Sequence, residues 1–196
     1  MSPILTGVIA SGISGHLTPP WSPEGAYDAL ATVTLSTATA SIEFAGIPTK
    51  YKHLQIRFIA RCSRSDYTVA AVYARFNSDT GSNYSGHYLG GNGGSAFAYG
   101  GANYSFAPAG LAAGTNVTAS IFSGGVIDVL DYQNSNKYKT VRALAGFNGN
   151  AAGTGDELNL QSGNWRNTNA ITSINFTLEN SANFLTNSTF ALYGVK

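Results

Sequence analysis

The sequence predicts an all-β protein, a jelly-roll-like β-sandwich preceded by an extended N-terminal arm. Apolar and polar residues alternate through much of the chain, and no stretch carries an apolar repeat of helical period over a helical length. Clusters rich in Gly, Asn and Ser separate the alternating segments. These residue types favour turns because Gly and Asn tolerate a positive φ. About ten short strands separated in this way are typical of a sandwich or jelly roll.

Residues 53–62 give the clearest strand signal, because apolar and polar side chains alternate along most of the segment. The face expected to be buried consists of Leu54, Ile56, Phe58, Ala60 and Cys62. The face expected to be exposed carries Gln55, Arg57 and Arg61. Further strands are expected at 31–36, 41–47, 67–77, 85–90, 117–122, 125–132, 139–147, 157–163, 171–179 and 188–196. Residues 90–116 are rich in Gly, Ala and Tyr and are interpreted as a long loop or insertion.

Residues 1–28 are expected to form an extended arm, and residues 29–196 a single β-sandwich domain. Four of the six prolines fall within the arm, which excludes regular helix there. Its large apolar side chains would be costly in water, so we expect the arm to dock on a partner subunit or on its own domain. These candidate assembly residues are Ile4, Leu5, Val8, Ile9, Ile13, Leu17 and Trp21.

The apolar stretch at 4–13 resembles neither a signal peptide nor a membrane span. A signal peptide needs a basic segment before its apolar core, but the first Lys or Arg of the chain is Lys50. The stretch is also shorter than the roughly 20 apolar residues that cross a bilayer. We therefore expect synthesis and assembly in a cytoplasm, without membrane insertion.

The chain is poor in charge. Only 11% of its residues are charged and the formal net charge is +1, whereas soluble proteins average about 25% charged residues. A near-neutral chain lacks the basic footprint that nucleic acid requires. Low charge also gives little protection against self-association, so we expect much of the surface to contact other subunits.

No catalytic, cofactor or metal site is expected from the sequence. The histidines His16, His53 and His87 lie far apart and follow no metal-ligand spacing. Asp156 and Glu157 are adjacent in a Gly-rich stretch and are interpreted as a solvated turn rather than a catalytic pair. Residues 77–83 carry one carboxylate, which favours a tight turn over a calcium loop. The lone Cys62 is expected to be a small buried hydrophobe.

Aromatic residues gather in the Gly-rich middle of the chain, where they suggest a binding surface. Tyrosine combined with Ser, Gly and Asn is typical of adaptable recognition surfaces. The candidate recognition residues are Tyr84, His87, Tyr88, Phe97, Tyr99 and Tyr104. The alternative, which we favour at this point, is that these aromatic residues line a subunit interface.

Several segments together resemble a family of virion structural proteins of tailed bacteriophages, of the kind found in cyanophages. The segments are SPILTGVIASGISG (2–15), FNSDTGSNYSGHYLGGNG (76–93), FSGGVIDVLDYQNSNKYKTVRALAG (122–146), SGNWRNTNAITSINF (162–176) and FALYGVK (190–196). The resemblance spans nearly the whole chain. It implies a non-catalytic β-sandwich that assembles as a homotrimer in a phage particle, and it supplies no catalytic residues.

Two functions are expected to compete. In the first, the protein is a trimeric capsid decoration or cement protein, assembled in the host bacterial cytoplasm and anchored to the major capsid protein, or to another virion component, through its arm. In the second, it is a tail fibre or spike protein that recognises a host surface glycan through the loops at 84–106. The short chain that starts with an apolar arm favours the first.

Overall fold

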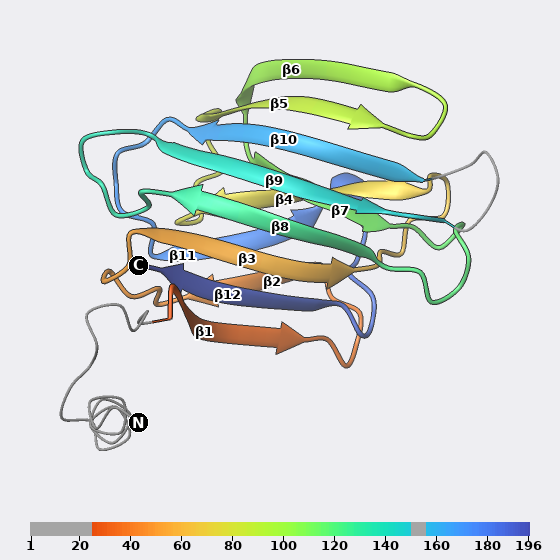
Figure 1. Ribbon diagram of the computed structural model, residues 1–196, viewed down its shortest axis with the longest axis horizontal. Coiled ribbons are helices and arrows are strands. Elements are labelled where there is room, and N and C mark those ends of the chain that lie inside the picture. Colours follow the sequence, from red (N-terminus) through yellow and green to blue (C-terminus); the bar gives the residue numbers. More distant parts are fainter. Residues whose placement is uncertain (1–24, 150–155) are drawn as a thin grey trace, which may run out of the picture.

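The protein is an all-β, jelly-roll-like sandwich of two antiparallel sheets (Figure 1). The computed structural model describes residues 25–149 and 156–196. The strands are β1 (Tyr27–Thr34), β2 (Ser41–Ala45), β3 (His53–Ala60), β4 (Val69–Phe76), β5 (Tyr84–Gly91), β6 (Ala96–Tyr104), β7 (Ala107–Ala113), β8 (Ser123–Leu130), β9 (Lys139–Phe147), β10 (Glu157–Trp165), β11 (Ser173–Leu178) and β12 (Thr189–Val195). A short 3-10 turn, η1 (Glu179–Ser181), follows β11.

The two sheets differ in width. The larger has eight strands in the order β1-β12-β3-β8-β9-β10-β5-β6, and the smaller has four in the order β2-β11-β4-β7. Strand β7 of the small sheet packs mainly on β8, β9 and β10. The β5–β6 hairpin lies beyond β10 at one edge of the large sheet (Figure 1).

The core lies between the sheets and is built from the side chains that the alternation predicts. Leu54, Ile56, Phe58 and Ala60 of β3 and the Cys62 thiol are all buried, which confirms the expected inner face. Phe58 stacks on Phe190 with ring centroids 5.1 Å apart, and Phe190 also contacts Phe176 at 5.2 Å. Close approach of the sheets at this point requires a residue without a side chain, because a Cβ on Gly110 would lie 2.8 Å from the Phe58 ring. Gly110 also has a φ of +119°, which other residues rarely adopt.

The arm lies outside the described residues, including every candidate assembly residue from Ile4 to Trp21. The β-sandwich begins two residues before the predicted start at residue 29, because β1 begins at Tyr27 and pairs with β12 at the edge of the large sheet.

Two sequence predictions in the middle of the chain are wrong. Residues 90–116 do not form a long loop, since they contain all of β6 and all of β7. Strand β7 escaped prediction because all seven of its residues are buried, so its small side chains show no alternation. Residues 117–122, predicted as a strand, form turns instead.

Arg61 explains why residues 117–122 do not pair in a sheet. The sequence predicted an exposed Arg61, but its side chain is buried and reaches into this segment. The guanidinium donates hydrogen bonds to the carbonyls of Val117 (3.1 Å), Thr118 (3.0 Å) and Ile121 (2.7 Å). These carbonyls therefore have a partner without a neighbouring strand.

The turn at 77–83 is organised by one carboxylate. Asp79 accepts hydrogen bonds from the Gly81 amide (2.8 Å), the Asn83 amide group (3.0 Å) and the indole of buried Trp165 (2.8 Å). These hydrogen bonds hold residues 77–83 in a turn, as the sequence predicts. Burial raises the pKa of Asp79, but the hydrogen bonds from Trp165, Asn83 and Gly81 outweigh it, so the pKa lies below its usual value.

A first prediction concerns Arg61. Arg61→Met removes the donor for three carbonyls and should lower the free energy of unfolding by about 3 kcal/mol, measured by urea denaturation. The matched control is Arg57→Met on the exposed face of β3, which should cost less than about 1 kcal/mol. Equal losses for the two variants would show that the carbonyl contacts of Arg61 contribute little.

A second prediction concerns pH. Folding lowers the pKa of Asp79 below 3.8, so its carboxylate stabilises the protein above about pH 4 and loses this effect as the pH falls through the folded pKa. At pH 7, Asp79→Asn should reduce the free energy of unfolding by about 2 kcal/mol. The difference between wild type and variant should shrink below pH 4, whereas exposed Glu43→Gln should cost little at pH 7. A difference for Asp79→Asn that does not vary with pH would contradict the assignment.

Candidate functional site

The outer face of the large sheet carries an apolar row across four neighbouring strands. Leu160 on β10 pairs with Leu89 on β5 and with Leu144 on β9, and Leu144 pairs with Val126 on β8. The three leucines are more than half exposed, at 52%, 57% and 51% respectively. With the exposed Leu158 beside them they form a surface that we call the leucine face. It consists of Leu89, Val126, Leu144, Leu158 and Leu160.

The leucine face is shallow and has little charge. Leu158 is flanked across the sheet by Gly91 and Gly146, which carry no side chains to cover it. On the other side, Asp128 and Arg142 form an ion pair at 3.6 Å. A groove of about 280 Å³ lies between this pair and the aliphatic side chains. A contiguous exposed apolar surface of this kind marks a protein contact more often than a free surface.

Strand β6 forms the edge of the same sheet next to the leucine face, and it lacks the charged residues and prolines that commonly block pairing. Edge strands commonly carry Lys, Pro or an inward-pointing charge that blocks pairing with another chain. The chain has no Asp, Glu, Lys or Arg between Asp79 and Asp128, and β6 contains no Pro. The outer edge of β6 is therefore available to a further strand.

A cleft lies on the opposite, inner side of the β5–β6 hairpin. It has a volume of about 540 Å³, and an adjoining recess of about 180 Å³ runs under Tyr88. The cleft opens because the hairpin extends beyond the small sheet, so that β4 and η1 face it across a gap. We call it the tyrosine cleft. Its main residues are Arg64, Tyr67, Tyr88, Phe97, Tyr99, Asp156, Glu157, Asn159 and Glu179.

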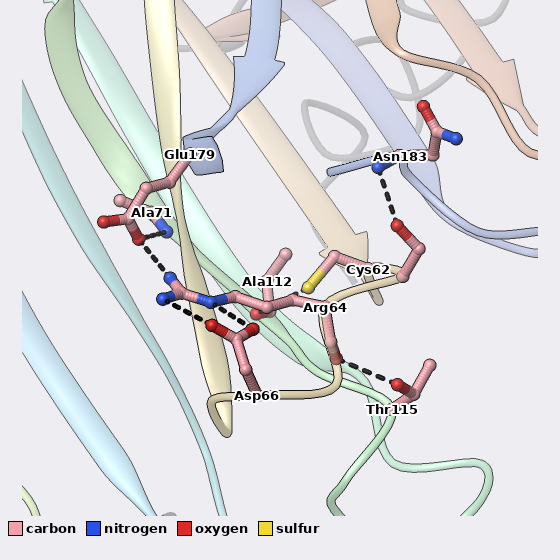
Figure 2. Close-up of polar contacts among 9 residues, drawn as sticks. Cys62, Arg64, Asp66, Ala71, Ala112, Thr115, Glu179 and Asn183 are labelled. Carbon is pink, nitrogen blue, oxygen red and sulfur yellow. Dashed lines mark hydrogen bonds and ion pairs between the residues drawn. The ribbon is translucent and has the colours of Figure 1, made fainter. Parts of the chain in front are cut away.

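An ion-pair network forms one wall of the tyrosine cleft (Figure 2). Arg64 donates to Glu179 (2.6 Å) and to Asp66 (3.0 Å). The guanidinium also lies 4.6 Å from the centre of the Tyr67 ring. Burial opposes the charge on Arg64, but Asp66 and Glu179 more than compensate and raise its pKa. The guanidinium is therefore fully ionised and already neutralised by two carboxylates.

Glu157 and Asn159 lie at the other wall, on the same face of β10 at the start of the strand. The Asn159 amide donates to the Glu157 carboxylate at 2.6 Å. Burial raises the pKa of Glu157, the Asn159 hydrogen bond opposes this, and nearby Glu179 raises it further. Asn159 is only 2% exposed, and its Oδ1 has no hydrogen-bond partner among the described residues.

The six candidate recognition residues are divided among four environments. Tyr88, Phe97 and Tyr99 lie together in the tyrosine cleft. His87 points to the outer face of β5, and Tyr104 stacks on Phe106 with centroids 5.6 Å apart. Tyr84 is fully buried against Trp165 and Phe76, so it cannot contact a ligand and is removed from the candidate set.

Sequence reasoning missed the polar half of the cleft. Glu157 was interpreted as part of a solvated turn, but it begins β10 and faces inward. Arg64 and Glu179 lie 115 positions apart in the chain, and no local motif connects them. The alternation of β10 points the other way, because apolar residues are expected inside, whereas Leu158 and Leu160 are exposed and Asn159 is buried.

Within the ranges 25–149 and 156–196, no three His, Cys, Asp or Glu side chains are grouped to hold a metal ion. The same residues contain no helix with the length and apolar character needed to cross a bilayer.

The fold and its surfaces define a wide antiparallel β-sandwich with an apolar outer face, an unprotected sheet edge and an aromatic cleft. No protein-family model matches the chain, and neither a curated protein nor a solved structure matches it.

Proposed function

We propose that this protein is a non-enzymatic structural protein of a bacteriophage particle, a homotrimeric capsid decoration protein anchored through its N-terminal arm. The observation that supports this proposal most directly is the leucine face beside the uncharged edge of β6. The resemblance of the sequence to phage virion proteins supports the same role.

The occupant of the leucine face is a second copy of this chain. Each leucine that becomes fully buried contributes about 1.5–3 kcal/mol before the costs of association. A net charge of +1 leaves little repulsion between identical subunits. A closed ring of copies also covers the edge of β6, which could otherwise pair with further copies in an open-ended assembly.

The described domain begins at the edge of the large sheet opposite to β6. Residue 25 leads into β1 at one edge, and β6 forms the other. Seven inter-strand spacings separate the two edges, or about 34 Å. This separation allows one edge to bind neighbouring copies while the arm at the other edge reaches the capsid shell.

A third prediction tests the oligomer. Leu144→Lys combined with Leu160→Lys places two ammonium groups in the contact, where they cannot be solvated, and should weaken association by at least about 100-fold. Light scattering coupled to gel filtration should give a trimer for wild type and a monomer for the double variant. The control is Thr32→Lys on exposed β1, which should remain trimeric. A monomeric wild type at micromolar concentration would overturn the proposal.

A fourth prediction tests the arm. Deletion of residues 1–24 leaves β1 intact, so the truncated protein should still form trimers but should fail to join the particle. Quantitative mass spectrometry of purified virions gives the copy number relative to the major capsid protein. A ratio near one to one is expected for the full chain, whereas a few per cent would place the protein in the tail. Full incorporation of the truncated protein would show that the arm is not the anchor.

A further inference from the structure

The aromatic wall of the tyrosine cleft is continuous and open to solvent. The Tyr88 and Tyr99 rings have centroids 5.0 Å apart, and the Phe97 ring stacks on Tyr99 at 5.9 Å. Tyr99 remains 59% exposed. Aromatic faces carry partial negative charge and attract the weakly positive C–H groups of a flat ligand. This wall is therefore suited to a ring with C–H groups on one face.

The polar wall contains a buried acceptor without a partner among the described residues. Asn159 Oδ1 is buried at the edge of the recess and has no partner in the described part of the chain. Buried acceptors of this kind are uncommon in folded proteins, and each calls for an explanation. A Cβ on Gly90 would lie 2.0 Å from this oxygen and 2.5 Å from the Phe97 ring. The glycine thus allows the orphaned acceptor and the aromatic wall to approach each other.

The charge of the cleft determines which ligands fit. Asp156, Glu157 and Glu179 line it, and the cation that also lines it, Arg64, is already paired with Glu179 and Asp66. An anionic ligand would meet repulsion from the carboxylates without a free cation to bind it. A ligand with several hydroxyl groups can donate hydrogen bonds to the carboxylates and adds no charge.

We propose that the tyrosine cleft binds a neutral pyranose unit of a glycan. The C–H face of the sugar lies against Tyr88 and Tyr99, and its hydroxyl groups donate to the Glu157 carboxylate. The cleft volume of about 540 Å³ is within the range of small-ligand sites. The glycan is bound and released intact, because the carboxylates of Glu157 and Glu179 are engaged by Asn159 and Arg64.

This site is separate from the proposed assembly surface. The leucine face lies on the outer side of the large sheet, whereas Tyr88 and Tyr99 project from the inner side of the same hairpin. A trimer therefore presents three clefts, and glycan binding can be measured whether or not the oligomer prediction holds.

The fifth prediction tests this site with the full chain on an array of oligosaccharides. The array contains neutral hexasaccharides (maltohexaose, cellohexaose and laminarihexaose) and acidic ones (hexagalacturonate and sialylated oligosaccharides). Binding should be confined to neutral members, and saturation-transfer NMR should place the C–H protons of the bound sugar against tyrosine rings. Tyr99→Ala should weaken binding about tenfold or more, because it removes the stacking surface. Tyr99→Phe retains the ring and should bind within about threefold of wild type.

A matched control separates the cleft from a general effect of losing a tyrosine. Tyr138 is exposed to a similar degree, 53% against 59% for Tyr99, and does not line the cleft. Tyr138→Ala should bind the neutral sugar like wild type, and thermal unfolding should show that both alanine variants are folded. The proposal would be overturned if no neutral sugar bound, if acidic sugars bound equally well, or if the bound sugar were cleaved. It would also be overturned if Tyr138→Ala lost as much sugar binding as Tyr99→Ala.

Discussion

Four strands cover the inner face of a sheet of eight, and this difference in width decides where the exposed surfaces lie. Close packing is possible where β7 lies over β8, β9 and β10 because β7 consists of small residues and Gly110 leaves room for Phe58. Beyond β10 the small sheet still covers the start of β5, where Tyr84 packs on Phe76 of β4 and Gly86 faces Pro108 of β7. Nearer the hairpin turn, Tyr88, Phe97 and Tyr99 line the tyrosine cleft instead.

The few charged side chains of this chain include several that hold turns together. Arg61 binds three carbonyls of the segment before β8, and Asp79 binds the indole of Trp165. Lys139 is fully buried and donates to the carbonyls of Asn134, Lys137 and Thr168. Burial of polar backbone groups in long turns requires such donors. Several of the few charged side chains thus lie inside the fold. The leucine face and the edge of β6 lack the charged residues that keep most soluble proteins from associating.

The two proposed activities use opposite faces of one hairpin. Leu89 faces outward on β5 and is proposed to contact a neighbouring copy, while Tyr88, the preceding residue, faces inward to the cleft. Alternation along a strand separates the two surfaces without any additional domain. A subunit contact on one face would also fix the hairpin whose other face forms the aromatic wall, and binding sites benefit from such a rigid support.

The sequence alone determined the all-β class, most strand positions and the inner face of β3, because an alternation of period two depends only on neighbouring residues. It also predicted that Tyr88, Phe97 and Tyr99 belong to one region. It did not determine β7, whose uniform burial removes the alternation, or the buried state of Arg61, whose carbonyl partners lie more than 50 positions away. The polar half of the cleft was likewise decided only by tertiary structure. Glu179 and Arg64 meet there because β11 and β4 pair in one sheet, and strand order depends on long-range contacts that no local pattern encodes.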